Sequence, residues 1–225
     1  MLNQQNFKTM EKTTELIFII DKSGSMAGLE ADTIGGFNSM LNKQKQEEGI
    51  CHISTVLFSN DSHVLHNRRN IEKVEPLTNK DYRVGGGTAL LDAMGDAIQH
   101  MVKVQKLLAE DERASNVVFV IITDGEENSS SKYTKRDIKK RIMSEQEKYG
   151  WEFIFLGANI DAIDTADSIG IQKERATNFV CDSAGVNLNF HCVAKAISQL
   201  RGKGSIEKDW DAEIMADYEE RGRCR

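Results

Sequence analysis

Short runs of apolar residues alternate along this chain with longer segments in which apolar residues recur every three or four positions. The short runs are rich in β-branched and aromatic side chains, which is typical of strands buried on both faces of a parallel sheet. The longer segments have the period of helices that bury one face. Strands are therefore expected at 15–20, 53–59, 63–67, 116–123, 151–156 and 177–181. Helices are expected at 27–48, 88–108, 133–149, 161–169 and 182–200.

This alternation predicts an α/β fold with a doubly wound sheet in three layers, in which helices cover both faces. Only a turn-like sequence separates the strands expected at 53–59 and 63–67, so they should form a hairpin that adds one antiparallel edge strand. The helix expected at 27–48 contains the pair Gly35 and Gly36, which we expect to allow a close approach to the sheet.

The two ends of the chain differ in pattern from its centre. Residues 1–13 are expected to be an N-terminal extension, 14–200 a single domain, and 201–225 a charged C-terminal tail. Within the tail, apolar residues recur every four positions, at Ile206, Trp210, Ile214 and Tyr218. This spacing predicts a short helix with one narrow apolar stripe. We expect the helix to pack on its own domain rather than to bind a partner.

The composition of the chain excludes some classes of binding partner and indicates a cellular compartment. The chain has 225 residues and a formal net charge of −6 at pH 7, so its net field does not attract the phosphates of a nucleic acid. The first 14 residues are polar and charged, unlike a targeting signal, and the apolar run at 16–20 is too short to span a membrane. The 4 cysteines are too scattered for a disulfide framework. We therefore expect a cytoplasmic protein with no membrane partner, monomeric by default.

Polar residues gather at three places where an expected strand ends or an expected helix begins. Asp21, Ser23 and Ser25 follow the first strand, Thr88 follows a run of glycines, and Asp124 follows the most apolar strand. Ligands of open α/β sheets bind at the carboxyl ends of strands, so we expect these side chains to lie close together. Their donor atoms are all oxygens, which is the set that a hard cation such as Mg²⁺ prefers.

The order and placement of these three loops resemble the von Willebrand factor A domain family over roughly residues 14–200. The resemblance implies a Rossmann-like fold whose central six-stranded sheet is mostly parallel, with one antiparallel edge strand. It also implies a complete metal-ion-dependent adhesion site (MIDAS), with ligands at Asp21, Ser23, Ser25, Thr88 and Asp124. In the family the ion is Mg²⁺, or sometimes Mn²⁺ or Ca²⁺, and a protein partner completes its shell with an Asp or Glu carboxylate. Stand-alone bacterial-type members often serve intracellular multiprotein systems.

Other functions agree with part of this pattern. A Mg²⁺-dependent phosphatase of the haloacid-dehalogenase type also places an Asp after an apolar strand. Such an enzyme needs a second carboxylate two residues later, where this chain has Ser23. The glycines at 85–87 lack the spacing of nucleotide-binding loops. An extracellular adhesion domain agrees with the resemblance but not with the polar N-terminal sequence. We therefore expect a non-enzymatic, metal-dependent protein-interaction module.

The remaining candidates have simpler interpretations. Cys181 and Cys192 are expected to pack as small apolar residues. Residues 132–141 are strongly basic, and we interpret them as the solvated face of a helix. If this helix begins near the metal site, its charge should attract an acidic partner.

Overall fold

The computed structural model describes residues 12–222, and its core is one six-stranded sheet with the strand order β3-β2-β1-β4-β5-β6. Strand β3 pairs with β2 in the antiparallel sense, and the other neighbours pair in parallel. The strands are β1 (Thr13–Asp21), β2 (Ile50–Phe58), β3 (Ser62–Asn70), β4 (Asn116–Thr123), β5 (Glu152–Gly157) and β6 (Ala176–Asn178). The predicted fold class, with its hairpin and antiparallel edge strand, is confirmed.

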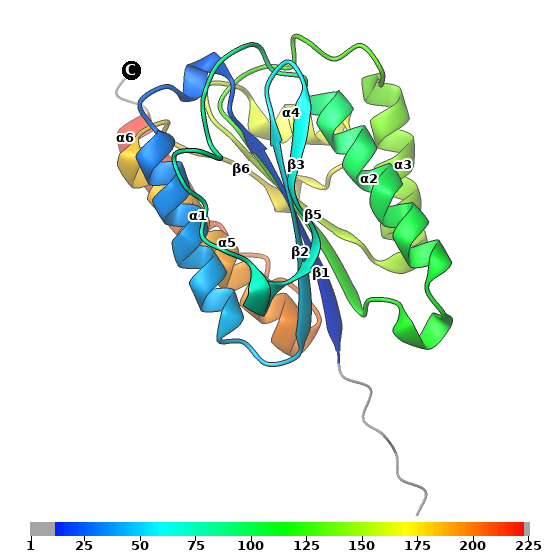
Figure 1. Ribbon diagram of the computed structural model, residues 1–225. Coiled ribbons are helices and arrows are strands. Elements are labelled where there is room, and N and C mark those ends of the chain that lie inside the picture. Colours follow the sequence, from blue (N-terminus) through cyan, green and yellow to red (C-terminus); the bar gives the residue numbers. More distant parts are fainter. Residues whose placement is uncertain (1–11, 223–225) are drawn as a thin grey trace, which may run out of the picture.

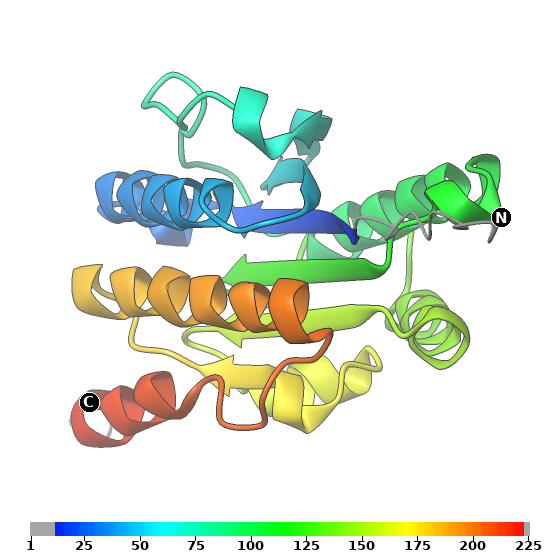
Figure 2. The ribbon, with the colours of Figure 1, turned by 90° about the horizontal axis from the view of Figure 1, so that it is seen from below.

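Helices cover both faces of the sheet (Figures 1 and 2). One face carries α1 (Glu30–Lys45), α5 (Ser183–Lys203) and α6 (Ala212–Arg221). The other carries α2 (Leu90–Leu107), α3 (Lys135–Tyr149) and α4 (Ala162–Ser168). Four single-turn 3₁₀ helices lie in the connections, at Gly24–Met26, Ile71–Lys73, Glu110–Glu112 and Lys173–Arg175. Within the described residues, no helix is long and apolar enough to cross a lipid bilayer.

Strand β1 shows how the sequence builds two cores at once. Its side chains alternate between the sheet faces, so Leu16 and Phe18 join the cluster under α1 and α5, while Ile17 and Ile19 join the cluster under α2 and α3. Both clusters are almost fully buried. Burial on both faces explains why this strand reads as a continuous apolar run.

The largest differences from the predicted elements lie at their ends. Helix α1 begins at Glu30 rather than at residue 27, because Gly28 adopts a left-handed conformation with φ 93°. Strand β6 ends at Asn178, although strand structure was predicted to 181. Helix α5 continues to Lys203, three residues beyond its predicted end, and Gly204 terminates it in the left-handed conformation.

Gly36 permits close helix packing, but against a different element from the one predicted. A Cβ atom at Gly36 would lie 2.3 Å from Cδ2 of Phe190, a residue of α5. No side chain fits in that space, so glycine at this position lets α1 approach α5 closely, while Phe37 and its neighbours pack α1 on the sheet.

The segment after α5 packs on the same face of the sheet. Ile206, Trp210 and Ile214 are buried in the core beneath α5. The indole N–H of Trp210 donates to the Glu174 carbonyl at 2.9 Å. Helix α6 begins only at Ala212, so the four apolar residues do not form one helical stripe, and Tyr218 is 37% exposed. The domain boundary at residue 200 stays a prediction, but residues beyond it contribute to the core.

A buried arginine closes the far end of α1. Arg201 on α5 is buried, and its guanidinium donates to the Gln44 carbonyl at 2.6 Å. It also donates to the carbonyls of Glu47, Glu48 and Gly49 at 3.1–3.2 Å. The carbonyl of Gln44, a buried residue in the last turn of α1, has no partner within the helix, so Arg201 satisfies it, and the bonds to residues 47–49 tie the following turn to α5.

Candidate metal centre

Three loops meet at the carboxyl end of the parallel strands, at the top of Figure 1. Strand β1 lies between β2 and β4, and Ile20 pairs with Ile122. This register places Asp21, the last residue of β1, beside Thr123, the last residue of β4. The loops that follow the two central strands therefore begin next to each other, as expected for open α/β sheets.

Hydroxyl and carboxylate groups from the first and third loops form one hydrogen-bonded network. Ser23 Oγ lies 3.0 Å from Ser25 Oγ, and Ser25 Oγ donates to Asp124 Oδ1 at 2.6 Å. Asp21 accepts from the Thr123 hydroxyl through Oδ2 at 2.6 Å and from the Ser23 N–H through Oδ1 at 2.7 Å. Four of the five predicted ligands thus lie in a single cluster.

Thr88 joins this cluster from the second loop. An ideal Cβ atom on Gly125 would lie 3.6 Å from both Ser25 Oγ and Thr88 Oγ1, so the two hydroxyls lie beside the same residue of the third loop. The structure therefore brings together all the residues predicted from the sequence. We call Asp21, Ser23, Ser25, Thr88 and Asp124 the oxygen cup. That the cup binds a metal stays a prediction.

Hydrogen bonds to main-chain carbonyls tie the first loop to the segment that leads into the second. The buried hydroxyl of Tyr82 donates to the carbonyl of Asp21. Gly85 N–H donates to the Lys22 carbonyl at 2.8 Å, and Gly24 N–H donates to the Gly86 carbonyl at 3.0 Å. These bonds hold the backbone of the cup without using the side-chain oxygens of its ligands.

Two amide side chains and one carboxylate position the second loop. Asn60 Oδ1 accepts from Gly87 N–H at 2.6 Å, and Asn128 Oδ1 accepts from Thr88 N–H at 2.9 Å. Glu127 caps α2 from outside the helix, because its Oε2 accepts from Leu91 N–H at 2.9 Å. A group that hydrogen-bonds to a metal-ligating residue, as Asn128 does to Thr88 of the predicted site, fixes the orientation of that residue.

The electrostatics of the cup favour a cation. Asp21 is 0% exposed and Asp124 is 1% exposed, and no ion pair in the described part of the chain includes either one. Burial raises the pKa of both carboxyls, against the hydrogen bonds that lower it, and the charge of Asp124 raises the pKa of Asp21 further. Two buried carboxylates without a basic partner, beside three hydroxyls, fit a hard divalent cation.

Cys181 also reaches this site, which the sequence did not indicate. It packs against the core as predicted, but its Sγ also lies 3.8 Å from Asp124 Oδ2. Burial, together with the charge of Asp124, raises the pKa of the Cys181 thiol to about 11. The thiol is therefore protonated near neutral pH and donates to the carboxylate.

Several supporting residues were missed in the sequence because no local pattern marks them. Tyr82, Asn60 and Asn128 lie in irregular segments, and each acts on a residue 27 or more positions away. A polar residue in a loop is ordinarily a turn former, so its type alone does not separate these roles. The one usable signal is the cluster of amides and hydroxyls that follows Asp124 in the third loop.

Comparison with known proteins agrees with this geometry. The profile of the von Willebrand factor type A domain matches residues 15–191 of the chain. Among curated proteins, no sequence matches.

Solved structures share the fold at low sequence identity. A von Willebrand factor type A structure from Catenulispora acidiphila aligns with a TM-score of 0.54 and 15% identity, over 83% of this chain and 42% of that one. Proximal thread matrix protein 1 from the mussel byssus, with a zinc-occupied MIDAS motif, aligns with a TM-score of 0.57 and 15% identity, over 84% and 46%. Manganese-loaded TRAP protein from Plasmodium vivax aligns with a TM-score of 0.51 and 14% identity, over 80% and 73%.

This chain spans less than half the length of the mussel and Catenulispora proteins. The likenesses show a shared fold, and the match of the family profile covers most of the chain. The chain therefore belongs to the von Willebrand factor type A domain family, a family of protein-interaction modules that bind divalent metals at a MIDAS.

Proposed function

We propose that this chain is a metal-dependent protein-interaction module whose oxygen cup is a complete MIDAS. Mg²⁺ is the proposed ion, with Mn²⁺ or Ca²⁺ as substitutes, and an Asp or Glu of a partner protein completes its shell. The carrying observation is the pair of buried carboxylates, Asp21 and Asp124, which have no basic partner among the residues that the structure describes and lie beside three hydroxyls. When bound, the ion supplies a positive charge that attracts an anionic oxygen.

The side chains of the cup differ in their exposure to solvent. Ser25 is exposed, whereas Asp21, Ser23, Thr88 and Asp124 are buried. A partner therefore approaches from the side of Ser25. Ser25 Oγ already donates to Asp124, and Thr123 donates to Asp21, so the carboxylates are oriented before a partner arrives. Preorganisation of this kind lowers the entropy lost on binding.

We propose binding rather than catalysis. An acid or base two residues after Asp21 is what a phosphatase of the haloacid-dehalogenase type needs, and that position holds a Ser23 hydroxyl bonded to Ser25. An assay with an aryl phosphate and Mg²⁺ separates the two functions. Turnover by the native protein that Asp21→Asn abolishes would overturn the binding proposal.

We further propose a cytoplasmic setting within a multiprotein system, with an extracellular adhesion domain as the alternative. Cys51, Cys181 and Cys192 are free thiols, which supports a reducing compartment. Fractionation of the source cells, with detection of the untagged chain, tests the location. Recovery from the culture medium or the cell surface would favour the adhesion domain.

A pull-down tests the metal bridge. Native protein is used as bait in Mg²⁺ and again in EDTA, and the Asp124→Asn variant is used in Mg²⁺. If the partner's carboxylate completes the metal shell, only the first bait retains the partner. An identical set of captured proteins in all three samples would refute the metal bridge.

A further inference from the structure

The start of α3 and the three residues before it form the most basic segment of an otherwise acidic chain. Residues 132–141 contain six basic residues and one acidic residue, in a chain whose formal net charge is −6. The acidic residue, Asp137, serves the helix itself, because it forms a capping box with Thr134. The charge of this segment is therefore not balanced from within.

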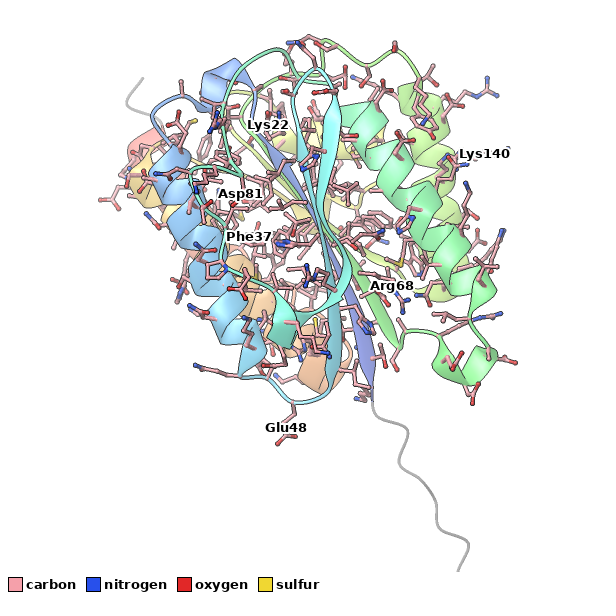
Figure 3. All side chains as sticks on the ribbon, in the orientation of Figure 1. Lys22, Phe37, Glu48, Arg68, Asp81 and Lys140 are labelled. Carbon is pink, nitrogen blue, oxygen red and sulfur yellow. The ribbon has the colours of Figure 1, made fainter. Side chains whose placement is uncertain are left out.

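Half of these cations are engaged by neighbouring groups of the protein. Lys132 pairs with Asp96, Lys139 Nζ donates to the Asp167 carbonyl at 3.0 Å, and Arg141 lies 5.3 Å from the centre of the Tyr133 ring. The others, Lys135, Arg136 and Lys140, are exposed and form no ion pair with a carboxylate within residues 12–222. Lys140 points away from the body of the domain in Figure 3. We call these three residues the α3 basic strip.

A hollow lies between Lys135, the first residue of the strip, and Gly125, which follows Asp124 of the oxygen cup. It has a volume of about 170 Å³, and Gly125 lines one part of it and Lys135 another. Gly125 is also the residue beside which the hydroxyls of Ser25 and Thr88 lie. A peptide segment of a partner that is bound at the cup can therefore continue through this hollow to the start of α3. Apolar walls from Leu90, Leu91 and Ile169 complete the hollow.

Two acidic residues, Glu126 and Glu127, line the same hollow and disfavour the binding of an anionic group inside it. Glu127 is already satisfied, because it accepts from the N–H groups of Leu91, Ser129 and Ser130. Glu126 is exposed and lines the hollow together with Lys135, so its negative charge offsets the positive charge of Lys135 there. Additional acidic groups of a ligand are therefore attracted beyond the hollow, to Arg136 and Lys140, rather than inside it.

We propose that the α3 basic strip is a second contact surface of the cup, and that it selects partners in which the metal-binding acid lies within an acidic segment. The inference rests on the proposed function, because the cup holds the first carboxylate. Surface charge pairs contribute little individually, but several in one strip raise the association rate and suppress basic partners. A nucleic acid is disfavoured, since the chain as a whole is acidic.

The test uses two labelled peptides of equal length. One carries a single glutamate in a glycine–serine background, and the other carries several consecutive glutamates. Their affinities for the native protein are measured by fluorescence anisotropy in Mg²⁺ at low ionic strength. We expect the polyacidic peptide to bind about tenfold more tightly, and the difference to shrink as salt screens the strip.

A triple variant, Lys135→Glu, Arg136→Glu and Lys140→Glu, removes the strip. The first two substitutions add acidic residues to the first turn of α3, where they favour the helix, so the variant should fold. The matched control is the triple variant Lys103→Glu, Lys106→Glu and Arg113→Glu. It makes the same charge change at exposed positions near the C-terminal end of α2, away from the cup. We expect the triple variant to lose the preference for the polyacidic peptide and the control to keep it.

The remaining outcomes overturn the inference in distinguishable ways. Equal binding of the two peptides to the native protein refutes the strip but leaves the cup intact, as does a preference that survives in the triple variant. If neither peptide binds in Mg²⁺, the proposed function fails and this inference fails with it. Tighter binding of a single-stranded RNA of equal charge, unaffected by Asp124→Asn, would identify a nucleic-acid surface instead.

Discussion

Replacing Asp124 with asparagine tests whether the oxygen cup is built for a cation. Asparagine keeps a side-chain oxygen that can accept the 2.6 Å bond from Ser25 Oγ, and it changes the volume little. It removes one of two buried carboxylates that form no ion pair within residues 12–222. Because burial raises the pKa of Asp124, its ionised form at neutral pH opposes folding of the metal-free chain. The variant should therefore be at least as stable as the native protein without metal.

The effect of metal should have the opposite sign. At a Mg²⁺ concentration 100-fold above its dissociation constant, binding stabilises the native state by about 2.7 kcal/mol. For a chain of 225 residues, 1 kcal/mol corresponds to roughly 2–4 °C, so the melting temperature should rise by about 5–11 °C. Asp124→Asn leaves a single carboxylate in the cup, and most of this rise should be lost. The two unfolding curves therefore exchange order as Mg²⁺ is added.

Differential scanning fluorimetry with EDTA and with increasing Mg²⁺ measures both effects. Asp111→Asn is the matched control, because Asp111 is exposed in the turn before β4 and should leave the Mg²⁺ response unchanged. An equal rise in Asp124→Asn and native protein would refute the cup as the metal site. A clear loss of stability of Asp124→Asn in EDTA would refute the electrostatic reasoning.

Three further predictions follow from single residues. Asn128→Ala removes the acceptor for Thr88 N–H and should weaken Mg²⁺ binding about tenfold in calorimetry, whereas unchanged affinity would exclude a positioning role. Arg201→Met leaves the buried Gln44 carbonyl without its guanidinium donor, also removes the bond to the Glu47 carbonyl, and should lower the free energy of unfolding in urea by about 2–4 kcal/mol, with Mg²⁺ affinity unchanged. Burial lowers the pKa of His66 below 6.5, so stability should fall as the pH drops through 6.5 and below. His66→Asn should reduce that fall and the exposed-site control His63→Asn should not, and equal profiles for all three proteins would contradict the assignment.

Much of the sheet and the cup could be predicted because the signals are local. Strands β1 and β4 are buried on both faces, so each is a continuous apolar run that stops where the chain reaches a polar loop. The stops place Asp21 and Asp124 at strand ends, and parallel pairing brings equivalent ends to one edge. Thr88 could be placed with them because it opens a helical pattern after glycines.

The tertiary structure alone decided how the cup is held and what surrounds it. The bond from Thr88 N–H to Asn128, the approach of Cys181 to Asp124 and the bond from Trp210 to the Glu174 carbonyl each join residues far apart in the chain. The same holds for the close contact between Gly36 on α1 and Phe190 on α5, which lets these two helices approach each other. Local propensity and periodicity report only which face of an element is buried. Which group meets that face depends on how whole layers pack, and so on contacts that no short stretch of sequence specifies.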